Sequence, residues 1–121
     1  MAERMLGGRG THLFAGIPVS DFQASLAWYT SLFGVPPSFF PNDREAVWEI
    51  AAERWLYIIE DQDRAGGAVH TLMCEDLEKV ISEIAVRGLE YGAEEIPGEG
   101  VRKVMYYDPD GNEIGVGRIP G

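Results

Sequence analysis

The sequence predicts an α+β fold made of two βαβββ modules, and two observations carry this prediction. A strand, an acidic cap, an amphipathic helix and a closing Gly occur twice, and 55 residues separate the two caps, Asp21 and Asp76. Near the C-terminus, the turn Asp108-Pro109-Asp110-Gly111-Asn112 joins two strand-like runs. Internal repetition indicates supersecondary units that pack on each other, and Asp, Pro, Gly and Asn are typical of tight turns.

The length and composition indicate one globular domain. A chain of 121 residues with 45% hydrophobic and 25% charged residues is large enough to bury its own core. We expect a flexible N-terminus at residues 1–10, because this stretch is polar and rich in Gly. A single domain then spans residues 11–121, with modules at about 11–61 and 68–119 and a polar linker at 62–67.

The first module begins with a strand and a helix. His12 to Val19 alternates with a period of two, so one set of side chains should pack under the helices and the other should face away from them. The first set is Leu13, Ala15, Ile17 and Val19, and the second is His12, Phe14, Gly16 and Pro18. Asp21, or Ser20, then caps a helix with an apolar stripe from Phe22 to Phe33. Gly34 and Pro36-Pro37 end that helix.

The remaining elements follow from shorter patterns. Three further strands are expected after the helix of the first module. The second module is expected to repeat the same order of elements. The expected segments are Ser38–Phe40, Ala46–Ala51 and Trp55–Glu60, then a strand at Ala68–Cys74, a helix at Asp76–Arg87, a short strand near Glu90–Ile96, a turn at Ile96–Gly100 and the C-terminal hairpin.

The chain resembles the vicinal oxygen chelate superfamily in three features taken together. These are the first unit, marked by Val19-Ser20-Asp21 and Phe33-Gly34, a second such unit, and the Asp108–Asn112 turn. This superfamily includes glyoxalase I, bleomycin-resistance proteins, fosfomycin-resistance enzymes and extradiol dioxygenases. The resemblance covers Thr11 to Ile119. It implies a cupped mixed sheet with the helices on its convex side and a ligand groove on its concave side. It also implies a homodimer, and leaves open whether the two modules pair compactly or exchange strands.

Enzymes of the superfamily hold a divalent metal in the groove through His and Glu side chains from four strands. The resemblance places Phe14, Tyr57, Val69 and Gly115 at these four positions. None of them offers an ordinary ligand to a hard metal. His12 and Glu113 share the faces of Phe14 and Gly115, whereas strand parity puts His70 and Glu60 on the opposite face. One His and one Glu make a poor site, so we expect no metal cofactor and keep His12 and Glu113 as weak metal candidates.

Without a metal, the groove is expected to be an apolar, aromatic pocket for a small molecule. The predicted ligand-binding residues are Phe14, Trp48, Trp55, Tyr57, Arg102, Tyr107 and Gly115. Gly16, Gly115 and Gly117 are expected to leave room for the ligand, and Arg64 and Lys103 are further candidates for polar contacts. Alternatively, the aromatic side chains pack against each other or against a second subunit, and the basic ones are solvated.

The charge balance limits the choice of partners. The formal net charge is −10, which excludes nucleic acid as a natural partner because phosphate binding needs clustered Lys and Arg. It favours a cationic ligand, or it serves only solubility. Cys74 is the only cysteine, so no internal disulfide can form, and a reducing cytoplasmic location is expected. The chain shows neither a membrane-spanning run nor a signal peptide, and we expect Cys74 to be a small buried apolar residue.

Two classes of function compete, and we favour the first. The first is a metal-free, non-catalytic binding protein that resembles the bleomycin-resistance branch and binds a cationic or aromatic small molecule as a dimer. The second is a metal-dependent lyase, isomerase or dioxygenase-like enzyme of the glyoxalase type, with displaced metal ligands at His12 and Glu113. A third hypothesis is a metal-free enzyme with Tyr57, Tyr107 or Glu113 as acid or base, but no paired base and nucleophile supports it.

Overall fold

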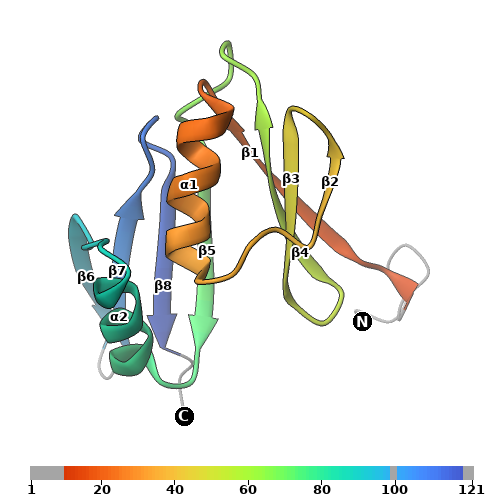
Figure 1. The fold of residues 1–121 in the computed structure, drawn as a ribbon. Helices are drawn as coiled ribbons and strands as arrows, with labels where there is room; N and C mark the ends of the chain where they lie inside the picture. Colours follow the sequence, from red (N-terminus) through yellow and green to blue (C-terminus); the bar gives the residue numbers. More distant parts are fainter. Residues whose placement is uncertain (1–9, 99–100, 119–121) are drawn as a thin grey trace.

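The computed structural model describes residues 10–98 and 101–118, and it confirms the predicted α+β fold with the order βαβββ-βαβββ (Figure 1). The elements are β1 (Leu13–Val19), α1 (Phe22–Phe33), β2 (Phe39–Asn42), β3 (Glu45–Ala51), β4 (Arg54–Glu60), β5 (Val69–Cys74), α2 (Leu77–Val86), β6 (Ala93–Gly98), β7 (Val101–Tyr107) and β8 (Glu113–Arg118). Apart from Gly10, the predicted flexible N-terminus lies outside the described residues. No helix among them is long and apolar enough to span a membrane.

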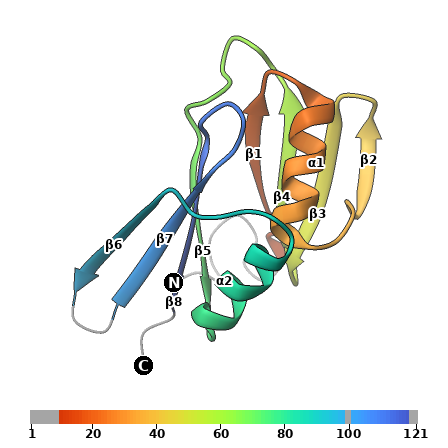
Figure 2. The same ribbon diagram turned by 60° about the vertical axis from the view of Figure 1, so that its left-hand side comes forward.

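Each module forms its own four-stranded mixed sheet (Figures 1 and 2). The strand orders are β1-β4-β3-β2 and β5-β8-β7-β6. In both sheets the first and fourth strands of the module are parallel, whereas the other neighbours are antiparallel. The predicted cupped sheet therefore consists of two separate sheets. In the described part of the chain, no strand of one sheet pairs with a strand of the other.

Both helices begin and end where the sequence predicts. The Asp21 carboxylate accepts a hydrogen bond from the Ala24 backbone N–H at 3.1 Å, and Asp76 accepts one from Lys79 at 3.1 Å. These caps satisfy backbone donors of the first turn that have no partner within the helix. Gly34 ends α1 in the left-handed region with φ of 77°, where a residue without Cβ is favoured.

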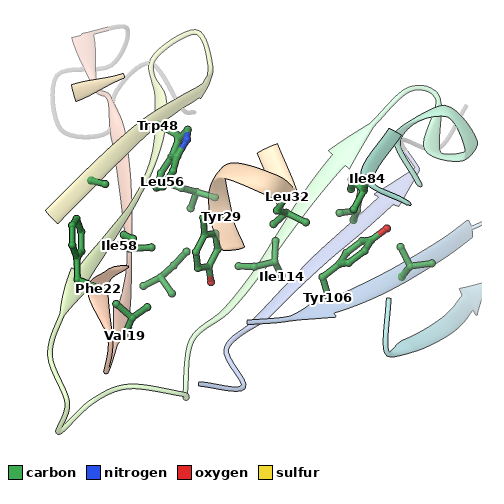
Figure 3. Close-up of a cluster of buried hydrophobic side chains, with 14 of the residues drawn as sticks. Val19, Phe22, Tyr29, Leu32, Trp48, Leu56, Ile58, Ile84, Tyr106 and Ile114 are labelled. Carbon is green, nitrogen blue, oxygen red and sulfur yellow. The ribbon is translucent and has the colours of Figure 1, made fainter. Parts of the chain in front are cut away.

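The helix α1 lies between the two sheets and packs on both (Figure 3). Tyr29 and Leu32 are buried between Ile58 of the first sheet and Ile114 of the second, and all four belong to one hydrophobic cluster. We call the face of each sheet that packs on the helices the helix side, and the opposite face the outer face. The two outer faces therefore point away from the shared core.

The turn between β7 and β8 fixes one module to the other. Asn112 is fully buried; its amide nitrogen donates to the Pro18 carbonyl at 2.9 Å, and its amide oxygen accepts the N–H groups of Gly66 and Ala68. Asp108 accepts the Tyr29 hydroxyl at 2.8 Å. Because buried polar groups are costly when unpaired, this set of bonds specifies how the modules sit together. The turn motif that organises the sequence thus also organises the structure.

Two strands continue past their predicted ends. The strand β2 continues through Pro41 to Asn42, and β6 runs through Pro97 to Gly98, where the sequence predicts a stop and a turn. Both strands lie at the edges of their sheets. Proline removes a backbone donor from the ladder, and an edge strand tolerates this because its outer side needs no partner.

Candidate functional site

The outer face of the first sheet carries a cluster of aromatic rings. Phe14 and Trp55 are directly opposite each other on β1 and β4, and their rings stack with centroids 5.2 Å apart and an interplanar angle of 1°. Phe39 from β2 meets Trp55 edge-on at 6.0 Å and 72°. We call Phe14, Phe39 and Trp55 the aromatic platform. Phe14 is 49% exposed and Phe39 is 44% exposed, so the platform is open at its surface.

Tyr57 occupies the space above Gly16, next to the platform. A Cβ on Gly16 would lie 2.6 Å from Cζ of Tyr57 and 2.7 Å from its hydroxyl oxygen. The prediction that Gly16 leaves room for a ligand is therefore wrong, because the neighbouring phenol fills that room. The phenol is half-buried and presents a polar group beside the exposed rings.

The outer face of the second sheet carries Thr71 and Lys103 beside its glycines in place of stacked rings. Lys103 of β7 leans over Gly115, whose added Cβ would lie 2.6 Å from Cε of the lysine and 3.2 Å from Oγ1 of Thr71. Met73 covers Gly117 in the same way, with its sulfur 2.9 Å from the position of an added Cβ. Long side chains fill the space above both glycines, so the expectation of open room is corrected here as well.

Tyr107 lies at the end of β7, 43% exposed, with its ring against Gly92. Its register partner across the ladder is Glu113. Both residues belong to the outer face of the second sheet and so lie on a different sheet from the aromatic platform. Within one chain, the structure therefore does not bring Tyr107 and Gly115 together with Phe14, Trp55 and Tyr57.

The residues present do not fit a divalent metal. Phe14, Tyr57, Val69 and Gly115 lie on the outer faces and offer no carboxylate or imidazole. His12 precedes β1 and is exposed, and the described part of the chain holds no group of three or more His, Cys, Asp or Glu placed to hold a metal. A ligand set for a hard cation needs more donors than one imidazole and one carboxylate.

Two predicted ligand-binding residues lie on the helix side. Trp48 is 2% exposed, packs against Tyr29 and Phe33, and donates its indole N–H to the Val35 carbonyl at 3.0 Å. The prediction placed it in the groove on its aromatic character alone, but its strand parity is that of Ala46, which is also buried.

Arg102 also lies on the helix side and is held by acidic neighbours. Its guanidinium donates to the carboxylates of Glu94 and Glu78, and these partners raise the pKa of Arg102 and lower that of Glu94. Arg102 therefore lies away from both outer faces. The loop residue Arg64 is paired with Asp61 at 2.7 Å. Lys103, by contrast, is the basic side chain that does face outward, with its ammonium 3.6 Å from Glu95.

His70 and Cys74 have structural surroundings. A ring nitrogen of His70 lies 3.2 Å from the Gly16 carbonyl, which links β5 to β1, in line with a hydrogen-bonded histidine. The Cys74 thiol is half-buried, contacts the Gly117 carbonyl at 3.4 Å, and has its pKa raised by burial. A thiol with a raised pKa is a poor nucleophile, which agrees with the interpretation of Cys74 as a small apolar residue.

Sequence reasoning missed Phe39 as a member of the platform. A strand was expected at Ser38–Phe40, but alternation within three residues cannot tell which phenylalanine faces outward. The register pairs Phe39 with Val47 across β2 and β3, and this pairing decides its side. The only hint in the sequence that an aromatic ring of this strand faces outward is the pair Phe39-Phe40 before Pro41.

The sequence and the fold match a known superfamily. The family model described as the Glyoxalase/Bleomycin resistance protein/Dioxygenase superfamily matches residues 11–116. This chain belongs to that superfamily. Comparison with curated proteins gives no match.

Solved structures agree with this assignment. A glyoxalase / bleomycin resistance protein from Catenulispora acidiphila DSM 44928 is 50% identical, with a TM-score of 0.87, over 91% of this chain and 99% of that one. A bleomycin-binding protein in complex with bleomycin is 18% identical, with a TM-score of 0.72, over 90% and 98% of the two chains. A lactoylglutathione lyase from Agrobacterium tumefaciens is 17% identical, with a TM-score of 0.72, over 88% and 91%. The last two share the fold with this chain.

Proposed function

We propose that this protein is a metal-free, non-catalytic binding protein that takes a planar aromatic ligand, preferably cationic, on the aromatic platform. The observation that carries the proposal is the open stack of Phe14 and Trp55, with centroids 5.2 Å apart. Exposed, ordered rings bind planar molecules by stacking and bind cations through the negative face of the ring. The bleomycin complex of a protein with the same fold supports this class of ligand.

The charge of the chain supports the cationic preference. With a formal net charge of −10, the protein attracts cations over distances beyond direct contact. The residue types at the four metal positions support binding without a metal. The single cysteine supports a reducing, cytoplasmic setting, which we include in the proposal.

A second copy of the chain completes the groove in this proposal. Large apolar side chains are exposed on the outer faces of both sheets, among them Val69 at 65%, Met73 at 46% and Tyr107 at 43%. A partner chain would cover these side chains. The platform of one chain and the outer face of the second sheet of its partner would then form the two walls of each groove.

Titration with ethidium, a planar aromatic cation, tests the proposal in a buffer that contains EDTA. The matched pair is Phe14→Ala and Phe40→Ala, because the two side chains are 49% and 53% exposed and only Phe14 belongs to the platform. We expect Phe14→Ala to weaken binding about tenfold, which corresponds to about 1.4 kcal/mol, and Phe40→Ala to change it less than twofold.

Two results would contradict the proposal. Equal effects of the two substitutions would show that the platform does not bind the probe. Binding that appears only after addition of Zn²⁺ or Mn²⁺ and is lost in His12→Ala would favour a metal site instead. Sedimentation at the same protein concentrations measures whether the binding species is a dimer.

A further inference from the structure

A half-open cavity of about 900 Å³ lies around the C-terminal end of α1 and between the two sheets, mainly on the helix side. Trp55, Thr71 and Met73 of the outer faces also reach its wall. Figure 3 shows four of the residues that line it: Trp48 and Leu56 from the first sheet, Leu32 from α1 and Ile84 from α2. The cavity forms because the sheets diverge and α1 fills only part of the wedge between them. Its walls come from both modules of one chain.

The cavity is too large to be a packing defect. Protein interiors are close-packed and hold few voids larger than a water molecule. Small-molecule pockets are mostly apolar and occupy about 300–1,000 Å³, a range that includes this cavity. Its wall is largely aliphatic, with Ala15, Ile50, Leu72, Val80 and Val116 among its members.

A free cation lies at the rim. Arg54 starts β4, is exposed and lines the cavity, and its side chain has no hydrogen bond or ion pair with the described residues. Arg87, the other arginine of the lining, is committed: its guanidinium donates to the carbonyls of Ser31 and Leu32 at 2.5 and 2.8 Å. Arg54 is thus available to a ligand, while Arg87 fixes α2 to the end of α1.

The carboxylates of the lining have local partners or neighbours. Glu49 accepts the backbone N–H of Glu53 at 3.3 Å. Glu83 lies one helical turn before Arg87 on α2, a spacing that favours attraction between the two charges. Of the two arginines in the lining, Arg54 is therefore the one whose guanidinium has no partner among the described residues.

We propose that this cavity is a second ligand site, which binds an apolar organic molecule with one anionic group. The apolar body would fill the wedge between the sheets, and the anion would pair with Arg54. A protein partner is a poorer fit, because a stable interface needs about 800 Å² of surface on each side and this surface is a half-open hollow between the sheets and helices. The site lies mainly on the helix side, and Trp55 is the one member of the aromatic platform that reaches its wall.

Two fluorescent probes that differ in one charge test the proposal. Anilinonaphthalene sulfonate has an apolar body and one anionic group, and phenylnaphthylamine has the same body without the charge. We expect both to bind the wild-type chain saturably at one site. We expect Arg54→Gln to weaken the sulfonate about three- to fivefold and to leave phenylnaphthylamine unchanged. Arg118→Gln is the control, because Arg118 is also exposed but does not line the cavity.

A second pair of variants tests the location. Val80 lines the cavity, whereas Val86 lies on the same helix, is 88% exposed and does not line it. Val80→Trp should fill the cavity and weaken both probes at least tenfold, and Val86→Trp should bind them like the wild type. Phe14→Ala should leave both affinities unchanged, which separates this site from the proposed groove.

The single cysteine gives a readout that needs no variant. The Cys74 side chain lies in the wall of the cavity, so bound probe should slow its reaction with a thiol reagent severalfold. Unprotected Cys74 at probe saturation, or equal binding by the Val80→Trp and Val86→Trp variants, would overturn the proposal. A change of oligomeric state in the Val80→Trp variant, measured by sedimentation beside the wild type, would also overturn the proposal. Such a change would show that a second copy of the chain occupies the cavity.

Discussion

The two modules share one backbone plan but carry different outer faces. In the first module, register pairs Phe14 with Trp55 and Gly16 with Tyr57. The equivalent rungs of the second module pair Val69 with Glu113 and Thr71 with Gly115. Each of these two cross-strand pairs contains an aromatic residue in the first module and none in the second. The helix sides are alike in character, since each is apolar and packs on α1 or α2.

This contrast shows which part of each module the fold constrains. The helix side must fill a shared core, and a change of volume there costs stability. The outer face has no such constraint within one chain, so it can change from metal ligands to rings or glycines while the fold persists. We therefore propose that the function of this chain depends on the difference between the two outer faces.

The largest effect is expected at the turn that holds the modules in place. Asn112→Ala removes four hydrogen bonds and leaves part-buried backbone groups of Pro18, Gly66 and Ala68 without their partner. We expect the free energy of unfolding to fall by about 3 kcal/mol or more, measured by urea denaturation. Asn42→Ala is the control: this residue makes similar turn bonds but is exposed, and should cost less than about 1 kcal/mol. Equal costs would show that the junction is no more important than a surface turn.

The next effect concerns the bond from α1 to the second module. Tyr29→Phe removes the hydroxyl that donates to Asp108, and we expect a loss of about 1.5–2 kcal/mol. Tyr91→Phe, whose hydroxyl makes a longer bond of 3.4 Å to Glu94 near the surface, should cost about 0.5 kcal/mol or less.

The same residue gives a pH dependence. Burial, and then the charge and hydrogen bond of Asp108, raise the pKa of Tyr29 above its ordinary value of about 10. The folded chain keeps this proton at a pH at which the unfolded chain releases it, so the free energy of unfolding falls as the pH rises above about 10. Tyr29→Phe should flatten this decline by up to about 1.4 kcal/mol per pH unit, whereas an unchanged slope would contradict the assigned cause.

The glycines of the two outer faces should respond unequally to a methyl group. Gly16→Ala forces the rigid Tyr57 ring to move, whereas Gly115→Ala meets the flexible end of Lys103. We expect losses of about 1–2 kcal/mol and less than about 1 kcal/mol, measured by urea denaturation. The reverse order would show that Lys103 is held more firmly than Tyr57.

The smallest effect is expected at Arg102. Its ion pairs with Glu78 and Glu94 are near the surface, so Arg102→Gln should shift the midpoint of urea denaturation less than any of the substitutions above. Because Arg102 lies on the helix side, its loss should leave ethidium binding unchanged. Weaker ethidium binding in this variant would restore the sequence-based prediction of a ligand contact.

Much of the fold was predictable because its signals are local. Helix caps and turns identify the boundaries of elements through the chemistry of single residues. The examples here are the caps Asp21 and Asp76, the helix-ending Gly34 and the Asp108–Asn112 turn. Strand parity also gave the outward placement of Phe14, which the structure bears out. The path of β2 and β6 through their prolines was not predictable, since it depends on which strands form the edges of the sheets.

The site was less predictable because it depends on distant pairing. The sequence alone does not distinguish Trp48 from Trp55 as a groove residue. The alternation of side chains along β3 places Trp48 on the helix side, where it is buried in the core. The filling of the space above Gly16 and Gly115 follows from the side chains of neighbouring strands, which no local pattern encodes. The separation of the two outer faces follows from α1 packing between the sheets, a consequence of tertiary contacts such as the bond from Tyr29 to Asp108.

Metal content is the most direct test of the central claim that the outer faces bind a ligand without a metal. The purified protein would be incubated with Zn²⁺, Ni²⁺, Mn²⁺ or Fe²⁺ and passed through a desalting column, and its metal would be measured by elemental analysis beside His12→Ala and Glu113→Gln. We expect far less than one metal per chain, with no difference among the three proteins. Near-stoichiometric metal in the wild type that is lost in either variant would contradict it.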